Sequence, residues 1–224
     1  MYILIMTTKI FFSSTEGVVG DITPAYYFLK PETIKEIKKT YPDVKIIVIL
    51  REPIDRLWSN VKHVIRRRGS DASSEQVTQI LSELSTYSLS YPYNGLKNWL
   101  DAFDSDQFFI GFYDELKDDT ILLYKRICMF LGLSDQLDSV FRPVDMVKKR
   151  TIKGELRSYK LDTPEALISF SFKSSTIDLE MTDEIRYELA ELFMPQVYKL
   201  SELVDSDHIR DWLKKYELIL NNNA

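Results

Sequence analysis

The most constraining feature of the sequence is a short apolar run that ends at an arginine. Residues 44–50 read Val-Lys-Ile-Ile-Val-Ile-Leu, and Arg51 follows directly. A run this short, rich in β-branched residues and almost without polar positions, predicts a parallel strand that is covered on both faces. Pro53 then predicts the first turn of a helix over 53–68. The sequence therefore predicts an α/β protein with Arg51 at the carboxyl end of a buried strand.

Arg51 has the chemistry of an anion ligand. Ligands of open α/β sheets bind just beyond the carboxyl ends of the strands, and a guanidinium offers two parallel N–H groups to a phosphate. Ser59, on the helix that follows, can add a hydroxyl to the same anion. We interpret the pair as half of a nucleotide-phosphate site, because an arginine at the end of a buried strand is costly without an anion. The alternative is a helix-capping arginine and a surface serine.

Several segments around this pair closely resemble the PAPS-dependent sulfotransferase family, in its bacterial or heparan-type form. PAPS is 3′-phosphoadenosine 5′-phosphosulfate. The segments that carry the resemblance are, in chain order, Gly20-Asp21-Ile22-Thr23-Pro24-Ala25-Tyr26, residues 42–53, Arg56 with Ser59, residues 94–99, residues 109–119 and residues 130–133. In that family an arginine and a serine at this spacing hold the 3′-phosphate of the donor.

The resemblance implies both a fold and a reaction. The fold is a three-layer, P-loop-like α/β domain with a short parallel sheet, which we expect to occupy residues 1–224 as a single domain. The reaction is transfer of a sulfuryl group from PAPS, as co-substrate, to a hydroxyl or amine acceptor such as a carbohydrate. No metal is implied. Asp21 falls on the acidic position of the Gly-Asp/Glu-x-Thr-Pro motif, and we interpret it as a structural carboxylate near the site.

One part of the family pattern has no counterpart before Gly20. The family opens with a strand and a Lys- and Gly-rich loop, whose backbone N–H groups and lysine wrap the 5′-phosphosulfate. Thr7-Thr8-Lys9, after a predicted strand over 2–6, is only weakly similar to that loop. We therefore expect a domain trimmed at its amino end, with weak or no transferase activity and no assigned catalytic base. The alternatives are a non-catalytic remnant that binds adenosine 3′,5′-bisphosphate or a partner chain, and a fragment whose start was assigned too late.

Two further residues are candidates for donor binding by resemblance. Tyr113 ends the predicted strand over 107–113, where cytosolic relatives place a tyrosine of a Tyr-Glu-Asp motif against the adenine. Its alternative is a core tyrosine with a satisfied hydroxyl. Lys153, in Lys153-Gly154, resembles the late Arg-Lys-Gly segment that closes over the 3′-phosphate, and its alternative is a solvated charged loop.

Composition and charge restrict the other function classes. The net charge of −5 gives no global reason to expect a nucleic-acid partner. Cys128 is the only cysteine, so no internal disulfide or zinc-type cysteine spacing exists. Residues 1–6 are apolar but too short to span a membrane. We expect a cytoplasmic protein without a membrane partner, and the sequence predicts no oligomeric state.

The remaining periodicity predicts the other helices. Helices are expected over 31–40, 76–84, 94–103 and 118–131, with Gly132 ending the last of these, followed by a helix capped by Thr182 and a final helix over 208–220. Residues 133–180 give no clear pattern.

Overall fold

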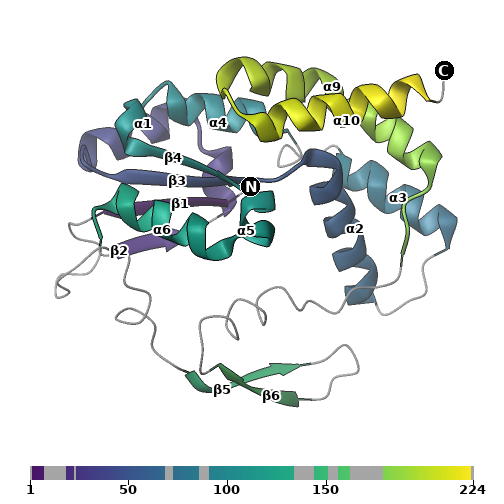
Figure 1. The fold of residues 1–224 in the computed structure, drawn as a ribbon, viewed down its shortest axis with the longest axis horizontal. Coiled ribbons are helices and arrows are strands. Elements are labelled where there is room, and N and C mark those ends of the chain that lie inside the picture. Colours follow the sequence, from purple (N-terminus) through teal and green to yellow (C-terminus); the bar gives the residue numbers. More distant parts are fainter. Residues whose placement is uncertain are drawn as a thin grey trace.

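The computed structural model describes residues 2–7, 19–22, 24–68, 73–85, 91–133, 144–150, 156–161 and 179–222. Its elements, in chain order, are β1 (Tyr2–Thr7), β2 (Val19–Ile22), η1 (Pro24–Phe28), α1 (Pro31–Thr40), β3 (Lys45–Leu50), α2 (Pro53–Arg68), α3 (Ser74–Ser85), α4 (Pro92–Leu100), η3 (Ser105–Gln107), β4 (Phe108–Phe112), α5 (Tyr113–Asp118), α6 (Thr120–Leu131), β5 (Val144–Arg150), β6 (Leu156–Leu161), α9 (Asp183–Leu203) and α10 (Asp207–Asn221) (Figure 1).

The main sheet has four described strands in the order β2-β1-β3-β4. β3 and β4 are parallel, and their register pairs Leu50 with Phe112. Both strands therefore end at the same edge of the sheet, and Arg51 and Tyr113 follow them there. This is the arrangement that the apolar run and the predicted strand over 107–113 require.

β1 joins the sheet as predicted, but its direction is opposite to that of a parallel first strand. It is antiparallel to β3, so that Met6 pairs with Lys45 and Tyr2 with Ile49. Its carboxyl end, Thr7, therefore lies at the edge where β3 begins. β2 follows β1 without an intervening described helix, and the two strands pair in the antiparallel sense, which needs no long crossover.

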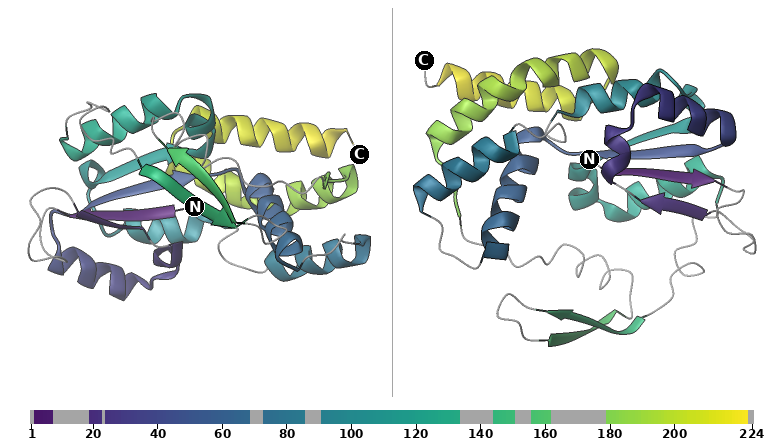
Figure 2. Two further views of the ribbon diagram at one scale, coloured as in Figure 1. Left: turned by 90° about the horizontal axis from the view of Figure 1, so that it is seen from below. Right: turned by 180° about the vertical axis from the view of Figure 1, so that it is seen from behind.

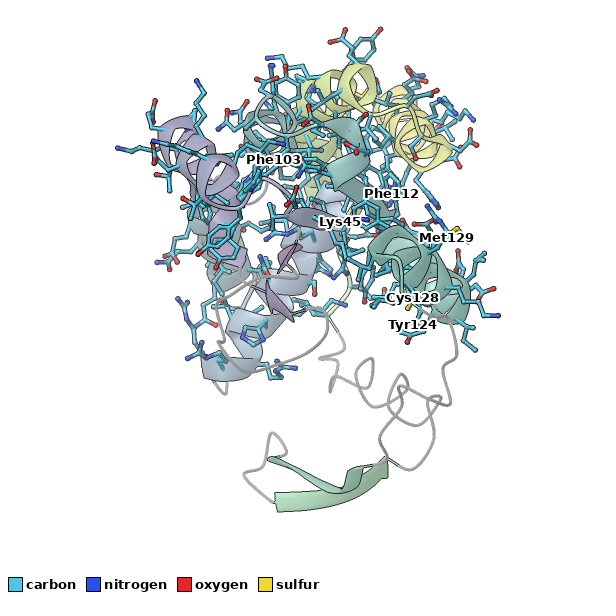
Figure 3. All side chains as sticks on the ribbon, turned by 90° about the vertical axis from the view of Figure 1, so that its left-hand side faces the viewer. Lys45, Phe103, Phe112, Tyr124, Cys128 and Met129 are labelled. Atoms are coloured by element: carbon cyan, nitrogen blue, oxygen red, sulfur yellow. The ribbon has the colours of Figure 1, made fainter. Side chains whose placement is uncertain are left out.

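Successive side chains of β3 point to opposite faces of the sheet, and helices cover both faces, so the fold has three layers. Ile46, Val48 and Leu50 point into a large core that α1, α2, α4, α9 and α10 build on one face. Ile47 and Ile49 point to the other face, where Phe109, Leu123 and their neighbours from α5 and α6 form a smaller core. Figure 3 shows Phe103 and Cys128 on opposite sides of the sheet. The expected three-layer α/β fold is confirmed, with β3 and β4 as its parallel pair.

Packing in the large core explains why Gly95 stands in one of the segments that resemble the family. The ring of Tyr27, which directly follows the Gly20–Tyr26 segment, packs on the backbone of Gly95, and a Cβ on Gly95 would lie 2.0 Å from the Tyr27 ring. The neighbouring Trp99 indole donates a hydrogen bond to the Tyr26 carbonyl at 3.1 Å. Two separate parts of the family pattern thus meet in one contact that admits no side chain at position 95.

The predicted helices agree closely with those observed. α1 and α2 have the expected bounds, the Thr182 hydroxyl accepts the Ile185 N–H at the start of α9, and Gly132 ends α6 with a left-handed φ of 69°. The predicted strand over 107–113 stops at Phe112, because Tyr113 already begins α5. The unassigned region 133–180 contains an antiparallel hairpin of β5 and β6, which forms a sheet of its own (Figure 2).

Candidate anion-binding site

Arg51 occupies the position that the sequence predicts, directly after β3 and two residues before α2. The residue is half-buried. Its Nε atom is fully buried and has no hydrogen-bond partner among the described residues. A buried guanidinium N–H without a partner costs on the order of 1–3 kcal/mol, so it is a donor that an added acceptor would satisfy.

Tyr113 meets Arg51 across the edge of the sheet. The guanidinium carbon of Arg51 lies 4.3 Å from the centre of the Tyr113 ring, within the range of a cation–π contact. Lys117 also approaches this ring, at 5.4 Å from its centre, and forms an ion pair with Asp114 at 2.9 Å. Asp114, and more weakly Asp55, raise the pKa of Lys117 above its ordinary value. Two cations therefore flank the Tyr113 ring.

Glu52 fixes the chain between Arg51 and α2. Its carboxylate is 3% exposed and accepts the backbone N–H groups of Ile54 at 2.9 Å and Asp55 at 2.8 Å. These are two of the donors that the first turn of a helix leaves without intrahelical partners. Burial raises the pKa of Glu52 above its ordinary value, whereas Lys215 and the hydroxyl of Tyr216 oppose that shift.

Ser59 lies further along α2. It is half-buried and six residues after Pro53, which places it about 9 Å along the helix axis. Asp55 precedes it by one helical turn and carries an ion pair to Lys215 at 3.7 Å. The structure thus brings Arg51 and Tyr113 into contact and places Ser59 on the helix that starts beside them.

Asp21 lies away from this edge, contrary to its predicted position near the site. The register pairs Asp21 with Ile5 and Ile5 with Ile46. Asp21 is therefore level with the second residue of β3, five residues before Arg51, or about 16 Å along the strand. The motif that contains Asp21 instead leads into η1 and the contact between Tyr27 and Gly95.

Of the Thr7-Thr8-Lys9 segment and Lys153, which are also predicted for the donor site, only Thr7 lies within the described residues. Thr7 lies at the opposite edge of the sheet from Arg51, and Lys9 is outside the described residues. Lys153 is also outside the described residues, between β5 and β6. The flanking strands carry the basic residues of this region, and their register pairs Lys149 with Arg157.

The basic end of α2 has the features of an ordinary helix terminus. Arg67 and Arg68 are exposed, and Arg68 lies 3.8 Å from Glu83 of α3. The His63 ring nitrogen contacts the Arg66 guanidinium at 2.7 Å. Cations at a helix carboxyl end are favoured by the helix dipole, which accounts for the cluster without a ligand.

The described residues give no support for a metal site or for a membrane-spanning helix. No group of three or more His, Cys, Asp or Glu side chains there is arranged to hold a metal ion. No helix in the same part of the chain combines the length and apolar character that crossing a membrane requires.

The comparison that decides the family is a match to the sequence model of the sulfotransferase family over residues 14–137. The chain belongs to the sulfotransferase family. The matched range contains Arg51, Ser59 and Tyr113, and so it confirms the resemblance that their surrounding segments predict.

Solved structures agree with this assignment at the level of the fold. The structure of this sulfotransferase-family chain is similar to that of a sulfotransferase from Alicyclobacillus acidocaldarius, with a TM-score of 0.55 and 23% sequence identity. The similarity covers 84% of this chain and 65% of that chain. A comparison with curated proteins found no match.

Sequence reasoning missed Glu52 and its partners on α10. An acidic residue directly before Pro53 is a recognisable helix-capping signal. Nothing local could have indicated Tyr216, because its hydroxyl donates to Glu52 across 164 residues of sequence.

Proposed function

We propose that this chain is a PAPS-dependent sulfotransferase domain in which Arg51 binds the 3′-phosphate of the donor. The observation that carries the proposal is the buried Arg51 Nε without a hydrogen-bond partner among the described residues, at the carboxyl edge of the parallel pair. A phosphate there would accept this N–H together with a second N–H of the guanidinium. Membership of the family supports PAPS as the source of that phosphate.

The other proposed donor contacts follow from the same edge. The hydroxyl of Ser59, on α2, would donate a hydrogen bond to the same phosphate. Tyr113 would lie against the adenine and keep its contact with Arg51. Lys153 is proposed as a later contact to the 3′-phosphate. The acceptor would carry a hydroxyl or an amine, as carbohydrates do, and would attack sulfur while a base removes its proton.

A second candidate function is binding of adenosine 3′,5′-bisphosphate without catalysis. The direction of β1 favours this second function, because β1 ends with Thr7 at the edge of the sheet opposite to Arg51. Sulfuryl transfer needs donors at the leaving 5′-phosphate, and the proposed contacts of Arg51, Ser59 and Tyr113 would serve only the 3′-phosphate half of the donor.

Displacement of bound, labelled PAPS tests the proposal. Adenosine 3′,5′-bisphosphate is expected to displace it, and 5′-AMP should do so only at a concentration at least about tenfold higher, since it lacks the 3′-phosphate. Equal displacement by both nucleotides would reject Arg51 as a 3′-phosphate ligand. Release of labelled bisphosphate in the presence of acceptors then separates catalysis from binding alone.

A further inference from the structure

We propose that Tyr216 and Lys215 of α10 are positioning residues for the anion site, and that they act on Arg51 through Glu52. The inference rests on the proposed function of Arg51. It extends the donor site to the last helix of the chain, which lies outside the residues that match the family model.

The Glu52 carboxylate receives donors from two elements at once. Its Oε1 atom accepts the Ile54 N–H and the Tyr216 hydroxyl, and its Oε2 atom accepts the Asp55 N–H and, at 3.4 Å, the Lys215 ammonium. Tyr216 is completely buried, and Lys215 is partly exposed. Each carboxylate oxygen thus holds one donor from α2 and one from α10, so that α10 determines the orientation of the group that caps α2.

Arg51 depends on this arrangement because it is the residue directly before Glu52. The capping bonds fix the backbone on the carboxyl side of Arg51, and β3 fixes the backbone on its amino side. A guanidinium whose direction is set in advance loses less conformational entropy when both of its N–H groups bind a phosphate. Losing the Tyr216 hydrogen bond would leave Glu52 held by α2 and Lys215, with more freedom at the Arg51 peptide.

The same helix also contacts the other side of the site. His208 of α10 packs against the Phe112 ring with centroids 4.6 Å apart, and Trp212 meets that ring edge-on at 5.6 Å. Phe112 immediately precedes Tyr113. α10 therefore spans from the end of β4 to the start of α2 and contacts the residue next to each of Tyr113 and Arg51. Figure 1 shows α10 beside α9 in the helical layer over the sheet.

Tyr216→Phe is the direct test, because it removes the hydroxyl and keeps the ring. Its matched control is Tyr187→Phe, which removes an exposed tyrosine hydroxyl that donates to Glu191 at 3.1 Å on α9. Two quantities are measured well below the melting temperature: the Kd values of adenosine 3′,5′-bisphosphate and 5′-AMP, and the NMR amide resonances of Ile54 and Asp55.

The proposal predicts a selective loss in Tyr216→Phe. The Kd of the bisphosphate should rise about tenfold while that of 5′-AMP changes little, and the two amide resonances should move. Tyr187→Phe should change neither quantity. An unchanged preference for the bisphosphate would overturn the inference, even with a lower melting temperature, because Tyr216 would then serve only the core.

Lys215→Met provides a second route if Tyr216→Phe does not fold, since Lys215 is partly exposed and its stem can be replaced without a cavity. Lys215→Met should weaken the binding of the bisphosphate more than the binding of 5′-AMP. Equal weakening for both nucleotides would contradict a positioning role for Lys215. Failure of the proposed function has a different signature. Wild-type protein would then show no preference for the bisphosphate, and the inference would fall with it.

Discussion

At the scale of single residues, the environment of Arg51 determines how strongly its substitution should change ligand binding. Its Nε is buried and its guanidinium lies against Tyr113, so the side chain is largely ordered before a ligand arrives. Binding a phosphate would then cost little conformational entropy, and most of the charge-assisted hydrogen bonding would appear as affinity.

Arg51→Ala is therefore expected to abolish the shift in melting temperature that adenosine 3′,5′-bisphosphate causes. The loss should be about 2 kcal/mol or more, whereas Ser59→Ala, which removes a neutral hydroxyl, should cost about 1 kcal/mol. Thermal melts with and without ligand measure both. Arg210→Ala is the control, because Arg210 is exposed and paired with Asp205 and Asp207. A full ligand-induced shift in Arg51→Ala would show that the site is assigned wrongly.

Gly95→Ala tests the contact that joins two parts of the family pattern. The new Cβ would lie 2.0 Å from the Tyr27 ring, so the ring must move within a filled core. We expect the free energy of unfolding to fall by about 1–3 kcal/mol, measured by urea denaturation. Asn94→Ala, at the exposed neighbouring position, should change it by less than about 0.5 kcal/mol. Equal effects at the two positions would contradict the packing account.

At the scale of elements, the junction of β3, α2 and α10 depends on a carboxylate that is kept out of water. Burial raises the pKa of Glu52 above the ordinary 4.5, so the folded chain binds the Glu52 proton more tightly than the unfolded chain. The stability that this proton contributes is fully present below pH 4.5 and is lost as pH rises through the raised folded pKa.

Glu52→Gln should remove that pH dependence and keep an acceptor for the Tyr216 hydroxyl. Relative to the variant, the wild-type free energy of unfolding should decline as pH rises above 4.5, by up to about 1.4 kcal/mol per pH unit. Urea denaturation of both proteins across the acid range measures the difference. A wild-type protein that gains stability over Glu52→Gln in this range would contradict the account.

Local sequence patterns predict where the helices and strands of this fold lie better than they predict the direction in which each strand runs in the sheet. The apolar run before Arg51 and the capping signals at Pro53 and Gly132 led to β3, α2 and α6 with nearly correct bounds. Periodicity carries no information on whether β1 runs parallel or antiparallel to β3, and that direction separates Thr7 from Arg51. The hairpin of β5 and β6 escaped prediction because its charged residues interrupt any apolar alternation.

The candidate site shows the same division. Arg51 was predicted because it directly follows a strand, and Tyr113 because it resembles the tyrosine of a family motif. The structure places both at one edge because the parallel strands β3 and β4 end together. The bond between Glu52 and Tyr216 depends on how α10 packs, which no local spacing reports. Arg51 is thus a residue that sequence can identify, whereas the groups that orient it require the tertiary structure.

At the scale of the whole molecule, the described residues would supply one half of the proposed donor site. Arg51, Tyr113 and α2 gather at the carboxyl edge of β3 and β4. The direction of β1 leaves Thr7 at the other edge. Binding and catalysis should therefore separate in this chain.

Sulfuryl transfer by the chain is expected to be very weak or absent. Removing even one donor from a leaving oxyanion typically costs about a hundredfold in rate. An assay with labelled PAPS and a panel of hydroxyl and amine acceptors measures transfer, with Lys9→Ala as the control for the Thr7-Thr8-Lys9 segment. Robust turnover that persists in Lys9→Ala would show that the catalytic half lies elsewhere in the chain.

The most direct test of the central claim is calorimetric titration of wild type and Arg51→Ala with adenosine 3′,5′-bisphosphate and with 5′-AMP. The two ligands differ only in the 3′-phosphate, and the two proteins differ only in the side chain proposed to bind it. Wild type is expected to bind the bisphosphate at least about tenfold more tightly than 5′-AMP, and Arg51→Ala should bind the two almost equally. The same preference in both proteins would contradict the assignment of Arg51 as the 3′-phosphate ligand.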